Sequence, residues 1–258
     1  DNLLSKDGDY FWITISGLIS QTEYAFQYLV DESIQVGDPY SDKILDPVED
    51  GYIDSDTYPN LKSYPDNPFP KGWVSVMQTG QQPYNWTTNN FVAPDKEDLI
   101  LYELLVRDFD ENHNYQAVID RLDYLQELGI NAIELMPIME FDGNLSWGYN
   151  PAFYFAPDKY YGTKNKLKSL IDECHARGIA VILDMVLNQT HEKNPLAKLY
   201  WDANSNRPAS DNPWLNQVAT HPFSVFYDFN HESKDTQHFV DSVNYYWLNE
   251  YRFDGFRF

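Results

Sequence analysis

The stretch TKNKLKSLIDECHARGIAVILDMVL, Thr163 to Leu187, decides the fold, because it reads as a whole helix followed directly by a whole buried strand. Apolar side chains recur in its first part at the three- and four-residue spacing of an amphipathic helix: Leu167, Leu170, Ile171 and Cys174. Thr163 can cap the start of this helix, and Gly178 can end it. The remaining residues, 179–187, form the continuous apolar run that is typical of a strand buried on both faces.

The same pairing of strand and helix recurs on both sides of this stretch. Upstream, residues 99–106 and 130–136 read as buried strands, and a helix from about Tyr115 to Gly129 lies between them. Downstream, residues 235–250 read as a helix, and a last strand begins near Arg252. Each helix must carry the chain back so that the next strand can run in the same direction, so this order predicts a parallel sheet.

The first part of the chain has a different pattern. Residues 10–18 and 22–31 alternate apolar and polar side chains, and Gly and Pro residues interrupt the segments around them. We therefore predict two domains: a strand-rich N-terminal module with its linker over residues 1–95, and an α/β domain over residues 96–258.

The four predicted parallel strands fit either an open doubly wound sheet or half of an eight-stranded barrel. No glycine-rich phosphate loop follows the first strand, which argues against a nucleotide-binding sheet. A long loop, residues 187–232, follows the third strand at its carboxyl end, where barrel enzymes build their sites. These features favour the first half of a TIM (β/α)8 barrel.

Composition excludes several classes of partner. The net charge of −22, from 18 basic and 40 acidic residues, would repel nucleic acid and anionic membranes. We expect no membrane span, because no run of 18 apolar residues is present. Cys174 is the only cysteine, so neither an internal disulfide nor a multi-cysteine zinc site can form. The aromatic content of 16% suits an uncharged substrate with flat apolar faces, although core packing explains most of it.

Polar residues at the ends of the buried strands are candidates for a site. Asp184 lies near the end of the third strand, and Arg257 lies on the fourth, on the same face as a residue that would follow Phe258. A carboxylate at that following position would be kept ionised by the guanidinium, as a nucleophile requires. The alternative is that Asp184 and Arg257 form only a structural ion pair.

Several segments resemble, in order, the strand motifs of the α-amylase family of glycoside hydrolases. They are LILYELLVRDF (99–109), GINAIELMP (129–137), SWGYNPAFYFAPDKYYG (146–162), DMVLNQ (184–189) and RFDGFRF (252–258). TEYAFQYLVD and DPYS, in the N-terminal module, resemble the β-sandwich that precedes the barrel in debranching and branching members. The resemblance therefore implies a partial β-sandwich followed by the first half of the catalytic barrel.

The resemblance also implies roles for individual residues. Asp184 and Arg257 would support the nucleophile, and Tyr149 would stack on the sugar at the cleavage point. Asn188 would have a structural or calcium-ligand place. Gln189 replaces the family's sugar-binding His, and it can donate a hydrogen bond but cannot become a cation. No cofactor is implied beyond a possible structural Ca²⁺.

The implied activity is that of a retaining hydrolase of α-glucans such as starch and glycogen, of the amylase or debranching type. A 1,4-α-glucan branching enzyme, which is a transglycosylase, and a non-catalytic glucan-binding protein are the alternatives. The family's nucleophile would directly follow Phe258, and its general acid, a Glu, would follow on the next strand. We therefore expect a chain that is truncated at both ends and inactive alone. The resemblance favours a secreted or periplasmic location.

Overall fold

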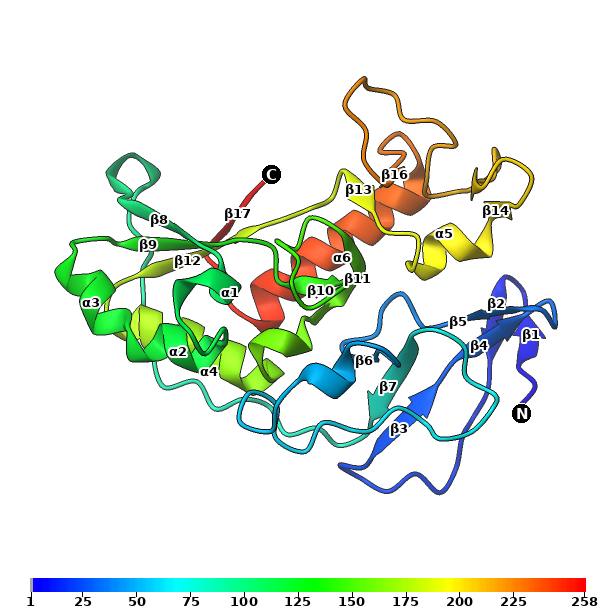
Figure 1. The fold of residues 1–258 in the computed structure, drawn as a ribbon, viewed down its shortest axis with the longest axis horizontal. Helices are drawn as coiled ribbons and strands as arrows, with labels where there is room; N and C mark the ends of the chain where they lie inside the picture. The colour runs from blue at the N-terminus through cyan, green and yellow to red at the C-terminus, as the bar shows by residue number, and fades with distance from the viewer. Residues whose placement is uncertain (1) are drawn as a thin grey trace.

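The structure, a computed structural model, describes residues 2–258 and has a four-stranded parallel sheet at its centre (Figure 1). The strands are β8 (Leu101–Leu104), β9 (Ala132–Leu135), β12 (Ala180–Asp184) and β17 (Gly255–Arg257), and the sheet order is β17-β12-β9-β8. All three strand pairs are parallel, which confirms the predicted sheet.

Helices connect these strands. They are α1 (Val106–Phe109), α2 (Tyr115–Asp120), α3 (Leu122–Glu127), α4 (Lys164–Ala176) and α6 (Lys234–Glu250). α4 starts where the sequence predicts, since the Thr163 side chain accepts a hydrogen bond of 3.1 Å from the Lys166 amide. The predicted single helix after Tyr115 is instead two helices, because the backbone at Arg121 leaves the helical conformation.

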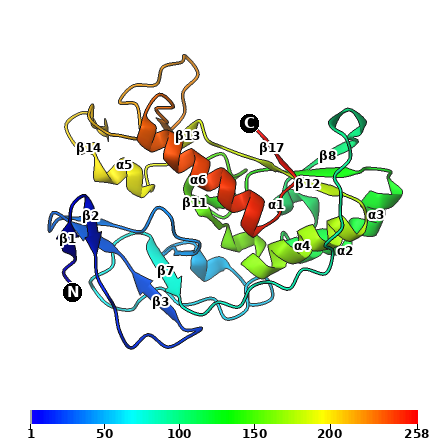
Figure 2. The same ribbon diagram turned by 180° about the vertical axis from the view of Figure 1, so that it is seen from behind.

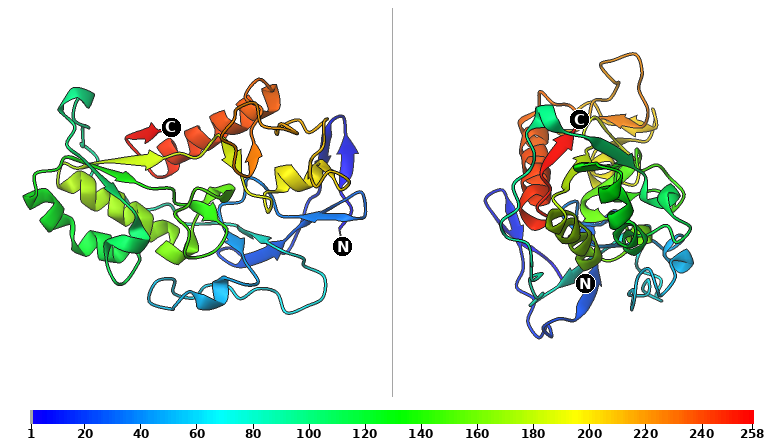
Figure 3. Two further views of the ribbon diagram at one scale, coloured as in Figure 1. Left: turned by 45° about the horizontal axis from the view of Figure 1, so that its top comes forward. Right: turned by 90° about the vertical axis from the view of Figure 1, so that its left-hand side faces the viewer.

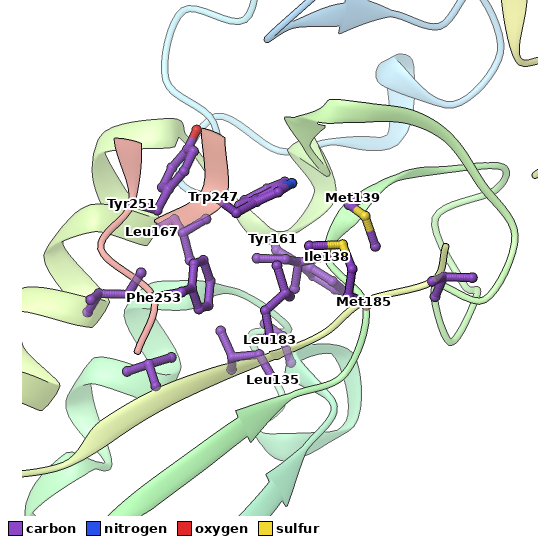
Figure 4. Close-up of a cluster of buried hydrophobic side chains, with 14 of the residues drawn as sticks. Leu135, Ile138, Met139, Tyr161, Leu167, Leu183, Met185, Trp247, Tyr251 and Phe253 are labelled. Atoms are coloured by element: carbon purple, nitrogen blue, oxygen red, sulfur yellow. The ribbon is translucent and has the colours of Figure 1, made fainter. Parts of the chain in front are cut away.

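The main hydrophobic core lies between the sheet and these helices (Figure 4). Leu135 and Leu183 reach it from the sheet, and Leu167 reaches it from α4. Trp247 of α6 is fully buried, and its indole N–H donates a 2.8 Å hydrogen bond to the Tyr154 carbonyl. The single polar group of this large side chain is therefore satisfied inside the core.

One prediction about the sheet is wrong. The apolar run at residues 99–106 was predicted to be buried on both faces, yet Leu101 is 42% exposed and Glu103 is also exposed. β8 pairs with β9 only and forms an edge of the described sheet, so its side chains lack the cover that the side chains of a second neighbouring strand would provide.

The first part of the chain contains short strands arranged in small sheets. They are β1 (Ser5–Asp7), β2 (Tyr10–Trp12), β3 (Glu23–Phe26), β4 (Tyr28–Val30), β5 (Ile34–Val36), β6 (Ile44–Leu45) and β7 (Val74–Gln78). β3, β7 and β6 form one sheet, while β1–β2 and β4–β5 are separate hairpins. The predicted strand over residues 22–31 is interrupted at Gln27, whose side chain donates hydrogen bonds of 2.8 Å to the Lys71 and Trp73 carbonyls.

Two excursions follow the carboxyl ends of β9 and β12. The first holds β10 (Met139–Phe141), β11 (Pro151–Pro157) and the 3₁₀ turn η3 (Lys159–Tyr161). The second, predicted as the loop 187–232, holds β13 (Gln189–Thr190), α5 (Pro195–Leu199), β14 (Trp201–Asp202), β15 (Arg207–Pro208) and β16 (Tyr227–Asp228). Figure 3 shows the second excursion beyond the carboxyl end of β12, next to the start of α6.

None of the helices within residues 2–258 combines the length and the apolar character that crossing a bilayer requires.

Candidate functional site

The carboxylate of Asp184 is the centre of the candidate site. Asp184 is the last residue of β12, and only 2% of its surface is exposed. Arg257 of β17 is its register partner, and the Arg257 Nη1 atom lies 2.9 Å from Asp184 Oδ2. The structure therefore brings together the two residues that the strand alternation placed at this edge of the sheet.

Tyr149 supplies a second donor to the same oxygen. Its hydroxyl donates a 2.6 Å hydrogen bond to Asp184 Oδ2 from the loop between β10 and β11. The preceding residue, Gly148, has φ +88°, and a Cβ atom there would lie 2.3 Å from the Pro137 carbonyl oxygen. Only glycine tolerates both that conformation and that approach, so Gly148 holds the loop against the end of β9 and places Tyr149.

The Asp184 carboxylate shifts the pKa values of both groups that contact it. The Asp184 carboxylate raises the pKa of the Arg257 guanidinium, both through charge and through the hydrogen bond. Burial and the hydrogen bond to Asp184 raise the pKa of the Tyr149 hydroxyl. Half of the Arg257 side chain is exposed, so this cation also faces the open side of the cluster. A negatively charged group placed there would be stabilised.

Sequence reasoning missed two carboxylates next to this cluster. Glu134 Oε1 lies 3.9 Å from Arg257 Nε, and Glu103 is the register partner of Glu134 on β8. Burial, followed by the charges of Asp184 and Glu103, raises the pKa of Glu134. The available signal was a single Glu inside each of two otherwise apolar strands, LYEL and AIEL.

Gln189 and Asn188 lie beside the cluster and contact the chain itself. The Gln189 side-chain amide donates a 2.7 Å hydrogen bond to the Tyr149 carbonyl, and its oxygen accepts a 3.2 Å hydrogen bond from Asn188 Nδ2. Gln189 is buried, whereas Asn188 is exposed. β12 ends at Asp184, so Asn188 lies four residues beyond the strand and its direction is not fixed by strand alternation. In this arrangement, Gln189 fixes the Tyr149 loop.

His191 lies farther along the same excursion and is also buried. Its Nε2 atom is 3.5 Å from Asp142 Oδ2, and burial lowers the pKa of the imidazole despite this carboxylate. Two tryptophans of this excursion have aromatic neighbours: Trp201 packs against Tyr227, and Trp214 packs against Tyr200.

The described residues do not assemble a metal site around Asn188. Within residues 2–258, no group of three or more His, Cys, Asp and Glu side chains is close enough to hold a metal ion. The acidic run at residues 50–56 is used internally, since Asp50 pairs with Lys159, and Asp54 accepts hydrogen bonds from Thr57. The described part of the chain therefore holds no carboxylate cluster of the kind that commonly binds calcium.

The chain is similar in sequence to known proteins. The family model "Alpha amylase, catalytic domain" matches residues 106–258. The malto-oligosyltrehalose trehalohydrolase of Saccharolobus solfataricus is 30% identical over 97% of this chain and 38% of its own length. The 1,4-alpha-glucan branching enzyme GlgB of Shewanella baltica is 37% identical over 56% of this chain and 19% of its own length. The chain thus spans well under half the length of either relative.

A solved structure shows the same arrangement of elements. The pullulanase type I of Bacillus subtilis, complexed with maltose, aligns with 96% of this chain and 36% of its own chain. The TM-score is 0.70 and the sequence identity is 25%.

Proposed function

The chain belongs to the α-amylase family, and from this premise we propose that it forms part of the catalytic domain of a retaining hydrolase of α-glucans. The catalytic domain of this family is a TIM barrel, of which the parallel strands β8, β9, β12 and β17 would be the first four. Residues 1–95 would be part of a β-sandwich that precedes the barrel.

One observation carries the proposal. Asp184, Arg257 and Tyr149 converge at the carboxyl ends of two adjacent parallel strands, and both donors contact the same carboxylate oxygen. Active sites of TIM-barrel enzymes lie at this end of the strands. Arg257 donates one of these hydrogen bonds and Tyr149 the other, so the buried Asp184 carboxylate is itself held in place and anchors the guanidinium.

The proposed chemistry is a double displacement by two carboxyl groups about 5 Å apart. The nucleophile would be an Asp directly after Phe258, on the face of β17 that carries Arg257. The guanidinium would keep that carboxylate ionised, and Asp184 would hold the guanidinium. The Tyr149 ring would stack on the sugar at the cleaved bond. No organic cofactor is needed, because the carboxyl groups supply both the nucleophile and the acid.

Glucan branching is the second candidate function. It is supported by the 37% identity to the branching enzyme over 145 residues, a higher identity than that to the trehalohydrolase. Both reactions use the same covalent intermediate and differ in whether water or a sugar hydroxyl attacks it. The products formed from amylose separate them, because hydrolysis releases reducing ends whereas transfer creates branch points.

The first test reads the codon that follows Phe258 in the encoding gene, where we expect Asp. Any residue without a carboxyl group overturns the proposed nucleophile. The second test measures the cleavage of maltoheptaose, by a protein that includes both proposed carboxyl groups, with NMR detection of the anomer that forms first. Retention predicts the α-anomer, and a β-anomer would rule out the double displacement.

In a protein that includes both proposed carboxyl groups, Asp184→Asn should lower kcat on maltoheptaose by about 100-fold, because the guanidinium loses its charged anchor. Asp211→Asn, which changes an exposed carboxylate in the second excursion, is the matched control and should leave kcat unchanged. Equal rates for the two variants would contradict a role for Asp184.

A further inference from the structure

A concave surface lies on the outer side of α6. Its volume is about 660 Å³, and it is lined by Phe155, His238, Asp241, Ser242, Tyr245, Tyr246, Asn249 and Glu250. It is an open surface groove and not an enclosed cavity, so it suits a chain that lies along the surface. In Figure 2, α6 lies toward the viewer, and no other element is drawn over it. The groove shares no residue with the Asp184 cluster.

The floor of the groove is a set of immobilised aromatic rings. The ring centroid of Phe155 of β11 lies 5.3 Å from that of Tyr246, and the Tyr40 ring, which is outside the groove lining, stacks on Phe155 at 4.8 Å. The Tyr40 ring also meets Phe239 edge to face at 5.7 Å. Because packing holds these rings in place, binding a ligand against them costs little conformational entropy.

Two tyrosines expose aromatic surface beside this floor. Tyr245, on α6, is 69% exposed. Tyr40, which belongs to the N-terminal region, is 46% exposed. Aromatic side chains that keep one face in water provide a flat apolar platform with a polar tip. The C–H faces of a sugar ring match such a platform in shape and in polarity.

The rim of the groove carries hydrogen-bonding groups. His238, Ser242, Tyr245 and Asn249 follow one another at helical spacing along α6, which places them on one stripe. Asn249 uses its amide nitrogen in a 2.7 Å hydrogen bond to the Tyr245 carbonyl, so its side-chain oxygen remains available. Asp241 is exposed on the same side of the helix. These groups can accept hydrogen bonds from hydroxyl groups.

The charge of the lining selects the kind of ligand. None of the lining residues is Lys or Arg, whereas Asp241 and Glu250 are acidic. Glu250 is already paired with Lys168, so Asp241 provides the uncompensated negative charge at the rim. An anionic ligand would be repelled, but a neutral polyol would be attracted through its hydroxyl donors.

We propose that this groove is a second binding site for an α-glucan chain, separate from the site of cleavage. The class of ligand rests on the proposed function, whereas the location rests on the groove alone. The aromatic floor would hold the sugar faces, and Asp241 and Asn249 would accept hydrogen bonds from the sugar hydroxyls. Such a site would hold a polysaccharide on the protein while the proposed cleavage site engages another part of the same polysaccharide.

The test is electrophoresis of the full chain through native gels that contain glycogen, which slow a protein that binds it. Tyr245→Ala is placed in the background of Tyr149→Ala, so that the proposed cleavage site does not contribute. We expect Tyr245→Ala to weaken the apparent affinity for glycogen at least fivefold. Added maltoheptaose should reverse the slowing of the Tyr149→Ala protein. Tyr52→Ala, at a tyrosine that is 74% exposed, is the matched control.

The outcomes separate the two proposals. If Tyr245→Ala migrates like Tyr52→Ala, the groove is not a glucan site. If Tyr149→Ala alone abolishes the slowing, the groove is again excluded, and the proposed function stands. If slowing persists in Tyr149→Ala and is lost when Tyr245→Ala is added to it, the groove is the second glucan-binding site. A dimer in light scattering that Tyr245→Ala dissociates would mean that a second copy fills the groove, and would overturn the proposal.

Discussion

Asp184 keeps a carboxylate almost completely out of water at the end of β12. Such burial is expensive unless the charge is paired and its oxygens are hydrogen-bonded. Here one oxygen accepts both the Tyr149 hydroxyl and an Arg257 nitrogen. At the scale of single residues, the arrangement is therefore mutual, because each donor stabilises the carboxylate, and the carboxylate holds each donor in place.

Tyr149→Phe tests this mutual support. The variant keeps the ring and removes only the hydroxyl, so Asp184 Oδ2 retains the guanidinium as its donor. We expect the free energy of unfolding to fall by about 1 kcal/mol, the usual worth of one intramolecular hydrogen bond. Urea unfolding measures the change. Tyr52→Phe removes an exposed hydroxyl and should leave the midpoint unchanged, so an equal midpoint for both variants would show that the bond contributes nothing.

The sequence predicts part of this cluster and not the rest, for a physical reason. Asp184 and Arg257 were found because alternation along a regular strand fixes which side chains share a face. Gln189 lies beyond the end of β12, where no period applies, and its hydrogen bond to the Tyr149 carbonyl depends on the fold of a distant loop. Glu134 was missed because its neighbours, Arg257 and Glu103, come from other strands.

At the scale of elements, α4 is the best-predicted helix. Its apolar stripe, its cap at Thr163 and its end at Gly178 all lie where the local sequence indicates. Thr163→Ala should lower the free energy of unfolding by about 1 kcal/mol, because the Lys166 amide loses its capping acceptor. The measurement is urea unfolding followed by far-UV circular dichroism.

The matched control for the cap is Thr220→Ala, at an exposed threonine outside any helix. It should change the free energy of unfolding by less than about 0.5 kcal/mol. A loss in Thr163→Ala no larger than in Thr220→Ala would mean that the start of α4 is held by packing alone.

Other elements depend on partners that the local sequence does not contain. The helix predicted from Tyr115 breaks at Arg121, although its apolar period continues into α3. The burial of β8 depends on which strands lie beside it, and in the described sheet β9 is its neighbour on one side. Period and caps identify an element, whereas its exposure is decided by tertiary neighbours.

At the scale of the whole molecule, a buried ionic group ties the N-terminal region to the excursion after β9. Lys159 is 3% exposed; it pairs with Glu140 of β10 and lies 3.2 Å from Asp50 in the N-terminal region. Burial opposes the charge on Lys159, but the two carboxylates outweigh it, and the pKa of the amine is raised. The Lys159 ammonium therefore balances the charges of Glu140 and Asp50 at the contact between the N-terminal region and the excursion after β9.

Lys159→Met tests whether this group holds the two regions together. Methionine fills a similar volume but leaves Glu140 and Asp50 without their cation, and breaking a buried pair in this way costs about 3–5 kcal/mol. We expect the free energy of unfolding to fall by this amount in urea, and cleavage by trypsin within residues 46–72 to accelerate. Lys96→Met removes an exposed partner of Glu97 and should cost less than about 1 kcal/mol.

Adding Glu140→Gln to Lys159→Met should restore part of the lost free energy of unfolding, because it removes one of the carboxylates left without a cation. If Lys159→Met is as stable as Lys96→Met, the contact between the regions depends on apolar packing instead.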